Sequence, residues 1–564
     1  MGISMDSLPP RYQKQAARKL DPVAYEKALQ FFHAEEAAKS LARQAQGSIS
    51  RATGEGFEAQ ILTACAYYRA HGIAEIDKTP EPIKVISGRR QSPSGCWSFE
   101  AVFTKQFEDK GFKWDVYVKT DDLKDFTDYP LLVCPTLLLR EKKCPLFKRR
   151  SFMHELEAYL NDTAGEPVQE LYDYLRDETD YPMDLIWKNM IRTMHPHDFT
   201  RNLALTRIIE PTVLDEATAQ SIRQNRRIAL AMHLYFMDML DSSKAFAAKF
   251  PPETDIFIST SSADKKPQIE AAFADLNVRS VTVTVVENQG RDVGAFLCDL
   301  APQLRDYDYA CFMHDKKAIQ TRPGSVGASF GYVCNENVCK NAAHVLNVLC
   351  EFEKDPYLGI LCPPYPTHGL YFMNMCSGGW GPNFENTKKL MKDLGIDAPV
   401  SGEKSPIAPY GSVFWFRPKA LAPLFDHGWQ HTDFPPEPLP QDGTISHAIE
   451  RVYPFVAQAA GYYPAVVMSR DYAVIRNDTM QAYATGMIRP LARVFDCTTF
   501  WGASSAAAGF AAKRHLFGVY GPYANSRRRH ARNWLRDNLP ESAYKGIINT
   551  KRAIFGPHHG PYED

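Results

Sequence analysis

The sequence lacks the long apolar segments that cross a lipid bilayer or lead a chain into export. No run approaches the roughly 18 consecutive apolar residues that a membrane-spanning helix needs. The opening stretch, MGISMDSLPPRYQKQAARKL, contains no apolar signal core. We therefore expect any membrane association to be peripheral.

The sequence also has almost no net charge and no organised set of cysteines. The formal net charge of -1 over 564 residues carries no global signature of nucleic-acid binding, so no nucleic-acid partner is expected. The 12 cysteines are scattered, and the pair Cys334 and Cys339 has no second Cys/His pair at zinc-site spacing. Unpaired cysteines in a chain of this size are typical of a reducing compartment, so the expected location is the cytoplasm.

The chain is too long for one ordinary hydrophobic core, and its composition is that of a globular protein. We expect a helical N-terminal segment at 1–50, an accessory segment at 51–110, an α/β connector at 111–222, a main α/β domain at 223–475 and a basic, helical C-terminal region at 476–564. Within the connector, the pattern predicts short strands at Trp114 to Val118 and at Leu131 to Leu139, followed by helices.

Strands that alternate with helices predict a parallel sheet in the main domain. Several of the expected strands are continuous apolar runs, which are typical of strands that are buried on both faces of a sheet. The expected strands are 228–236, 255–260, 281–286, 307–313, 358–362 and 413–416, and the expected helices include 239–250, 266–273 and 341–352.

The stretch from Ser280 to Lys317 organises this domain. A β-branched strand leads into a Gly-bearing turn at 288–292, and apolar residues at helical spacing follow, before a second strand ends in His-Asp-Lys-Lys at 314–317. Strand, turn, helix and strand form a βαβ unit whose charged groups lie where the strands end. In open α/β sheets, ligands bind at that edge.

Three motifs occur in order along the chain. The first is Asn-x-Gly-Arg-Asp followed by Tyr-Asp-Tyr and His-x-Lys-Lys; the second is Gly-x-x-Phe-Trp-x-Arg-Pro; the third is Asp-Gly-Thr-x-x-His-x-x-Glu-Arg. They stand at 288–317, 411–418 and 442–451. Together they resemble the rhamnan synthesis F family of glycosyltransferases, and weaker upstream matches extend the resemblance to about residues 112 to 475.

The resemblance implies an α/β fold of the GT-A type. This is a Rossmann-type, mostly parallel sheet flanked by helices, in which a nucleotide-binding half precedes an acceptor-binding half. It also implies transfer of a sugar from a nucleotide-sugar donor, with dTDP-rhamnose as the expected donor. The acceptor would be a cell-surface polysaccharide or its lipid-linked precursor at the inner face of the membrane. An inverting displacement with one carboxylate base is the expected mechanism.

Such a transfer needs a group that neutralises the leaving diphosphate, either a metal ion or a cationic side chain. Asp315 stands where GT-A enzymes usually carry a metal-binding Asp-x-Asp, but it is a single carboxylate, so a requirement for Mg or Mn stays open. Lys316 or Lys317 would then supply the positive charge. The donor-binding candidates are Asn288, Gly290, Arg291, Asp292, His314, Asp315, Lys316 and Lys317.

Arg291 is the most informative of these residues. A cation beside a helix N-terminus is unfavourable unless an anion is shared, so we expect Arg291 to face the donor phosphates or to pair with a carboxylate of the site. Gly290 permits a positive φ or a close approach of the backbone. Asn288 or Asp292 alone would serve equally well as a helix cap.

The acceptor hydroxyl needs a carboxylate that takes its proton, and the candidates are Asp442 and Glu450. Asp442 doubles as an ordinary N-cap of the helix that follows, and the choice between the two stays open. Trp415 and His447 are the candidate contacts to the sugar, although Trp415 has the same sequence signature as a core tryptophan.

Two other functions were considered for this chain. In the first, a degenerate transferase fold would serve as a scaffold or a polysaccharide-binding subunit. Residues 54–106 resemble the N-terminal part of a phage or Gram-positive Holliday-junction resolvase, but the acidic residues that bind metal in that family are missing, so nuclease activity is not expected. The basic C-terminal region is either a peripheral contact to anionic lipid or a soluble tail.

Overall fold

The computed structural model describes residues 111–495 except 114, 128, 161, 316–322, 377 and 441, together with residues 497 and 503. The expected N-terminal segment, the resolvase-like segment and most of the basic C-terminal region lie outside the described residues. The chain divides into two compact units after Ser151.

The described part of the first unit is helical. It contains η2 (Asp121–Leu123), α5 (Pro130–Val133) and α6 (Pro135–Arg140), and α7 (Arg150–Met153) includes the division between the units. The strand predicted at 131–139 is therefore wrong. A proline occupies the first position of both α5 and α6, where its fixed φ favours a helix start, and this local signal outweighs the apolar run. No strand is assigned at 115–118 either.

The second unit is built on one eight-stranded sheet with the order β1-β8-β6-β7-β5-β2-β3-β4. All neighbouring strands are parallel except β7, which is antiparallel to β5 and to β6. The strands are β1 (Thr206–Ile209), β2 (Ile228–His233), β3 (Thr254–Thr260), β4 (Ser280–Val285), β5 (Tyr309–His314), β6 (Leu358–Cys362), β7 (Phe414–Phe416) and β8 (Tyr463–Ser469). The expected α/β class with a mostly parallel sheet is confirmed. The first strand of the sheet, β1, lies before residue 223, where the main domain was expected to begin.

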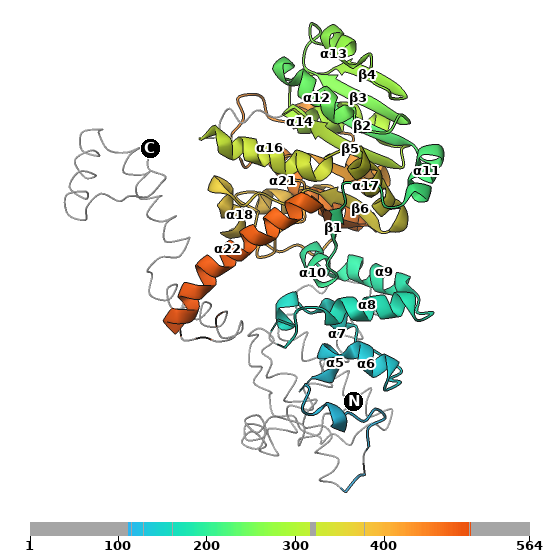
Figure 1. Ribbon diagram of the computed structural model, residues 1–564. Coiled ribbons are helices and arrows are strands. Elements are labelled where there is room, and N and C mark those ends of the chain that lie inside the picture. Colours follow the sequence, from blue (N-terminus) through green and yellow to red (C-terminus); the bar gives the residue numbers. More distant parts are fainter. Residues whose placement is uncertain are drawn as a thin grey trace, which may run out of the picture. The chain divides into compact units, whose positions relative to one another are not determined.

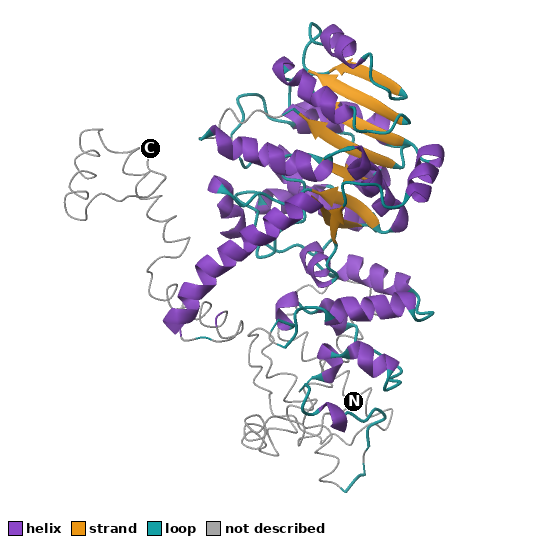
Figure 2. Cartoon of the chain, viewed as in Figure 1, coloured by secondary structure: helices purple, strands orange, loops and turns teal. Residues whose placement is uncertain are grey.

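Helices cover both faces of this sheet, as Figures 1 and 2 show. The helices of the second unit are η3 (Leu156–Ala158), α8 (Pro167–Asp177), α9 (Met183–Thr193), α10 (Pro196–Asn202), α11 (Glu216–Asn225), η4 (Met237–Met239), α12 (Leu240–Ala247), α13 (Lys266–Phe273), α14 (Arg291–Gly294), the π-helical segment η5 (Ala295–Leu300), α15 (Ala301–Leu304), α16 (Gly324–Val338), α17 (Ala342–Lys354), η6 (Gly369–Phe372), α18 (Met373–Cys376), α19 (Phe384–Asp393), η7 (Pro418–Leu421), α20 (Ala422–Phe425), η8 (His431–Asp433), α21 (Ile445–Ala459) and α22 (Arg470–Phe495).

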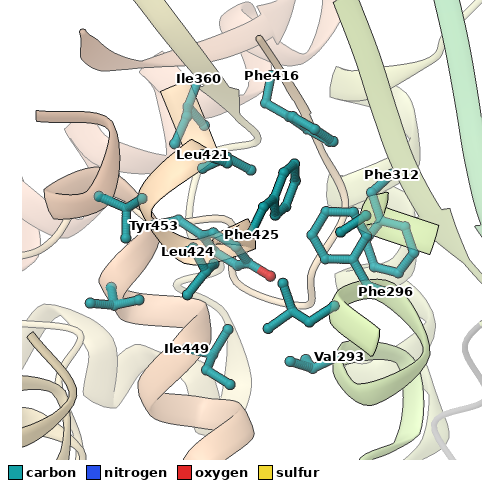
Figure 3. Close-up of a cluster of buried hydrophobic side chains, with 14 of the residues drawn as sticks. Val293, Phe296, Phe312, Ile360, Phe416, Leu421, Leu424, Phe425, Ile449 and Tyr453 are labelled. Carbon is teal, nitrogen blue, oxygen red and sulfur yellow. The ribbon is translucent and has the colours of Figure 1, made fainter. Parts of the chain in front are cut away.

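The main hydrophobic core lies between one face of the sheet and two helical segments (Figure 3). The continuous run α14–η5–α15 contributes Val293 and Phe296, and α21 contributes Ile449 and Tyr453. Phe296 stacks on Phe312 of β5 with ring centroids 4.3 Å apart. The apolar spacing that predicted a helix after the Gly turn is thus the face that packs on the sheet.

The opposite face of the sheet is also covered, because alternate residues of each strand point to opposite sides. On β7, Trp415 points away from the core of Figure 3 and stacks on Phe250, with ring centroids 5.3 Å apart. On β5, Tyr309 packs against Phe352 of α17. Burial on both faces explains why these strands read as unbroken apolar runs.

The order of the strands reverses between β2 and β5. The chain passes from β2 outward to β3 and β4, and then returns to place β5 on the other side of β2. The carboxyl ends of two parallel strands that diverge in this way form the edge at which open α/β sheets bind ligands. In this chain the edge is formed by His233 and His314, which are register partners.

Candidate functional site

Asp315 joins the ends of β5 and β2. Its Oδ2 accepts hydrogen bonds from the backbone N–H groups of Tyr235, at 2.8 Å, and Phe236, at 2.6 Å. Its side chain is buried, and burial raises the pKa of the Asp315 carboxyl against the lowering effect of these hydrogen bonds and of His314. Its Oδ1 has no hydrogen-bond partner among the described residues. Asp315 therefore fixes the backbone that follows β2.

His314 lies at the end of β5, with a backbone carbonyl oxygen beside each ring nitrogen. Its Nδ1 lies 3.0 Å from the backbone oxygen of Asp315, and its Nε2 lies 2.6 Å from the backbone oxygen of Gly411. A carbonyl oxygen only accepts hydrogen bonds, so both contacts are hydrogen bonds only in the imidazolium form, in which both ring nitrogens carry hydrogen. Asp292 Oδ2, 3.6 Å from Nε2, is the nearby counter-charge.

The neighbouring histidine differs. His233 is buried and places its Nδ1 2.9 Å from Ser259 Oγ, a hydroxyl that either donates or accepts. Burial lowers the pKa of His233 to about 4, so the ring is neutral at pH 7. The two register-paired histidines at this edge thus have different partners, which are two backbone carbonyls for His314 and a hydroxyl for His233.

Gly411 connects β5 with α21. Its carbonyl oxygen accepts from His314, and its backbone N–H donates to Glu450 Oε1 at 2.5 Å. Gly411 and Ser412 have φ of 86° and 55°, a strained turn for a non-glycine residue at the second position. The other oxygen of Glu450 accepts from Arg451 Nη1 at 3.0 Å. Both oxygens of Glu450 therefore hold structure in place.

Asp442 has a different environment. Thr444 is the N-cap of α21, so the capping role considered for Asp442 is wrong. Asp442 Oδ1 accepts from Asn383 Nδ2 at 2.7 Å and from the Gly443 N–H at 2.8 Å, and His447 Nε2 lies 3.9 Å away. The Asp442 side chain is 43% exposed. Its second oxygen makes no hydrogen bond to a described residue.

The turn between β4 and α14 adopts the conformation that its glycine permits. Gly290 has a φ of 82° and is the N-cap of α14, so neither Asn288 nor Asp292 caps this helix. A Cβ at Gly290 would lie 2.6 Å from the Phe434 ring. Arg291 forms a bidentate pair with Glu437, with Nε–Oε1 at 2.7 Å and Nη2–Oε2 at 3.1 Å. Arg291 was expected to face the donor phosphates or to pair with a carboxylate of the site, and Glu437 is a carboxylate that was not among the expected site residues.

Comparison with known proteins matches the part of the chain that contains the three motifs. The rhamnan synthesis protein F family matches residues 94–462, which is more than half of the chain. This chain belongs to the rhamnan synthesis protein F family. It is also similar to the uncharacterized protein WxcX of Xanthomonas campestris pv. campestris, strains B100 and ATCC 33913, with 27% identity over 290 residues in each case. That similarity covers 51% of this chain but 38% of each relative, so the chain spans well under half of their length.

Of the remaining site candidates in this rhamnan synthesis F member, the structure describes Trp415 and His447. Trp415 is fully buried, donates its Nε1–H to the Val338 carbonyl at 2.9 Å and presents no open ring face, which fits the core alternative. His447 is partly buried, with Nδ1 2.7 Å from Thr444 Oγ1. Lys316 and Lys317 lie outside the described residues.

The described side chains do not form a protein-ligated metal centre. No group of three or more His, Cys, Asp or Glu side chains is arranged there to hold a metal ion. Asp315 has already committed one oxygen to two backbone N–H groups. No helix in the described residues has the length and apolar character to span a membrane.

The structure therefore brings together the first and third motifs of the rhamnan synthesis F pattern. Gly411 contacts His314 through its carbonyl oxygen and Glu450 through its N–H, and Asp292 lies 3.6 Å from the same nitrogen of His314. Residues that the sequence did not single out include Glu437, Asn383 and the N–H groups of Tyr235 and Phe236. Gly411 is the first residue of the second motif and contacts residues of the first and third motifs. Its position in a motif was the only signal in the sequence that pointed to this role.

Proposed function

We propose that this rhamnan synthesis F member is a glycosyltransferase that acts in the synthesis of a surface polysaccharide. It would take a sugar from a nucleotide-sugar donor, with dTDP-rhamnose as the proposed donor, and transfer it to the polysaccharide or to a lipid-linked precursor. One observation carries the proposal. His314 places Nε2 2.6 Å from the Gly411 carbonyl oxygen and 3.6 Å from Asp292 Oδ2, at the point where the strand order of the sheet reverses, and in its imidazolium form it would offer a positive charge to a diphosphate there.

In this proposal the donor diphosphate lies at the carboxyl ends of β2 and β5. His314 would bind the diphosphate in its imidazolium form, whose positive charge favours a bound anion. Lys316 and Lys317 are proposed as further phosphate contacts. Because the described residues do not fit a protein-ligated metal, no step of the proposed reaction passes through Mg or Mn.

We assign the base role to Asp442 and a structural role to Glu450. Both oxygens of Glu450 accept hydrogen bonds from fixed partners, the Gly411 N–H and Arg451, and its side chain is only 14% exposed. Asp442 keeps one oxygen without a described hydrogen-bond partner and is 43% exposed. In the proposed step, this oxygen takes the proton of the acceptor hydroxyl as the hydroxyl oxygen attacks the anomeric carbon. The bond from that carbon to the diphosphate breaks, and the nucleoside diphosphate leaves with inversion.

The test is a transfer assay with dTDP-rhamnose and an isolated membrane acceptor, run with and without added Mg. Asp442→Asn should lower the rate about 10²- to 10⁴-fold and leave donor binding unchanged, because only the proton acceptor is lost. Glu385→Gln on α19, whose side chain is 77% exposed, is the matched control and should change nothing. Full activity of Asp442→Asn would remove the proposed base.

The rival proposal is a scaffold with a degenerate transferase fold. The observation in its favour is that Asp315, a single carboxylate in place of an Asp-x-Asp, already accepts two backbone hydrogen bonds. A thermal-shift panel of nucleotide sugars separates the two proposals. Stabilisation by one donor supports the transferase, whereas the absence of a shift with every donor favours the scaffold.

A further inference from the structure

A strap, residues 429–440, holds the turn between β4 and α14 (residues 286–290) from outside the sheet. The buried Phe434 ring lies against the backbone of Gly290, and the Phe434 carbonyl accepts a hydrogen bond from Gln289 Nε2 at 2.5 Å. His431 places Nδ1 3.0 Å from the Gln289 backbone oxygen. Arg291 pairs with Glu437 at the far end of the strap. Four separate contacts therefore fix a turn that ends with a positive φ at Gly290, followed by a positive φ at Arg291, the first residue of α14.

The contact made by His431 depends on a proton. Its Nε2 lies 2.9 Å from Asp299 Oδ2 on η5, while its Nδ1 faces the Gln289 carbonyl. A carbonyl oxygen and an ionised carboxylate both only accept, so His431 and Asp299 must hold two hydrogens between them for both bonds to exist. These are present either as imidazolium and carboxylate or as neutral imidazole and carboxylic acid.

The surroundings favour retention of that proton. Burial raises the pKa of Asp299, with a further rise from Glu287, while His431 lowers it. Asp433 of the strap and Glu287 are the acidic groups that also act on the adjacent Cys298, whose pKa burial raises to about 12. The charged groups that surround the pair are therefore acidic, and together with burial they raise the pKa of the Asp299 carboxyl, which favours a proton held between it and His431.

We infer that His431 is a positioning residue for the β4–α14 turn, and that it holds the turn through a proton shared with Asp299. The turn presents Arg291 and Asp292, so the importance of this contact for donor binding rests on the proposed function. The strap also ends two residues before Asp442. One segment thus links the turn of the proposed donor site with the proposed base.

The sign of the pH dependence follows from the shared proton. When the turn is released, His431 loses the Gln289 carbonyl but still faces Asp299, and its Nδ1 no longer needs a hydrogen. The held state therefore binds the extra proton more tightly than the released state, and above the pH at which the released pair gives it up, each further unit of pH should favour release of the turn by up to about tenfold until the held pair itself titrates. Below that pH, both states are protonated and the contact is at full strength.

The test is hydrogen exchange of the full chain, followed by mass spectrometry of peptides that contain residues 287–294. Opening equilibria are compared at several pH values after correction for intrinsic exchange. In the wild-type chain, opening should increase with pH as stated above. His431→Gln should open the turn at every pH. His427→Gln, which alters an exposed histidine whose ring lies at a tilt 4.6 Å from the Trp429 ring, is the matched control and should match the wild type.

Asp299→Asn distinguishes a shared proton from simple packing. An amide donates to the Nε2 lone pair of a neutral imidazole, whose Nδ1–H still reaches the Gln289 carbonyl, so both bonds persist without the extra proton. This variant should keep the turn closed and abolish its pH dependence. A wild-type turn whose opening does not change with pH, or an Asp299→Asn variant with the wild-type pH profile, would overturn the inference. If the predicted exchange is seen but no nucleotide sugar binds, the proposed function fails and the inference stands.

Discussion

Replacement of Gly290 by alanine should break the contact between the β4–α14 turn and the strap. The added Cβ would lie 2.6 Å and 2.8 Å from two atoms of the Phe434 ring and 2.9 Å from Gly294 Cα. Real Cβ atoms do not approach so closely, and Phe434 is only 1% exposed, so the ring has little room to move. The φ of 82° adds a second cost for any residue with a Cβ.

The magnitude of the effect has two parts. A left-handed backbone costs an alanine about 1–2 kcal/mol, and overpacking of a filled site costs typically about 1–3 kcal/mol. We therefore expect Gly290→Ala to lower the free energy of unfolding of the second unit by about 2–5 kcal/mol. Urea denaturation followed by tryptophan fluorescence measures this change.

Gly428 provides the matched control, because it lies one residue before the strap with a φ of 76° and nothing within 4 Å of the place that a Cβ would occupy. Gly428→Ala should show only the backbone cost of about 1–2 kcal/mol. In the double variant with Phe434→Ala, the packing part of the Gly290→Ala effect should disappear, which a double-mutant cycle measures. If Gly290→Ala destabilises no more than Gly428→Ala, the packing argument is refuted.

Three further predictions concern stability. Trp415→Ala should cost about 3–5 kcal/mol in urea denaturation, because it empties a fully buried site beneath Phe250; a loss below about 1 kcal/mol would contradict a core role. Burial lowers the pKa of His195 from 6.5 to about 3, so its contribution to stability is full above pH 6.5 and falls as the pH decreases, by about 2 kcal/mol at pH 5; His195→Gln should flatten this part of the pH profile, and an unchanged slope would count against it. Glu437→Gln should change the free energy of unfolding by no more than about 1 kcal/mol, since the pair with Arg291 is about 40% exposed on both sides; a larger loss would show that the pair is stronger than its exposure suggests.

The sheet was predictable because its strands are marked by local patterns. Leu358–Cys362 and Lys266–Phe273 were predicted with the bounds that the structure has, since each combines a clear apolar signal with clear flanking residues. The helices that begin at Pro130 and Pro135 were missed, because an apolar run was given more weight than a proline at the first helical position.

The site was predictable only in part, because its contacts join residues that are distant in the sequence. Arg291 and Glu437 are 146 residues apart, so no local pattern could reveal the pair. Gly411 and Glu450 are likewise brought together only by the fold. Trp415 stayed ambiguous because a strand buried on both faces gives the same apolar letters whichever way each side chain points.

The most direct test of the central claim is the position at which a nucleotide sugar binds. Hydrogen exchange of the full chain with and without dTDP-rhamnose should show protection at the ends of β2 and β5, around residues 233–236 and 314–315, and at the turn 287–292. His314→Gln should weaken that protection, and His233→Gln should have the smaller effect because His233 is neutral. Binding of dTDP-rhamnose that protects some other part of the chain, and leaves these strand ends unchanged, would contradict the account.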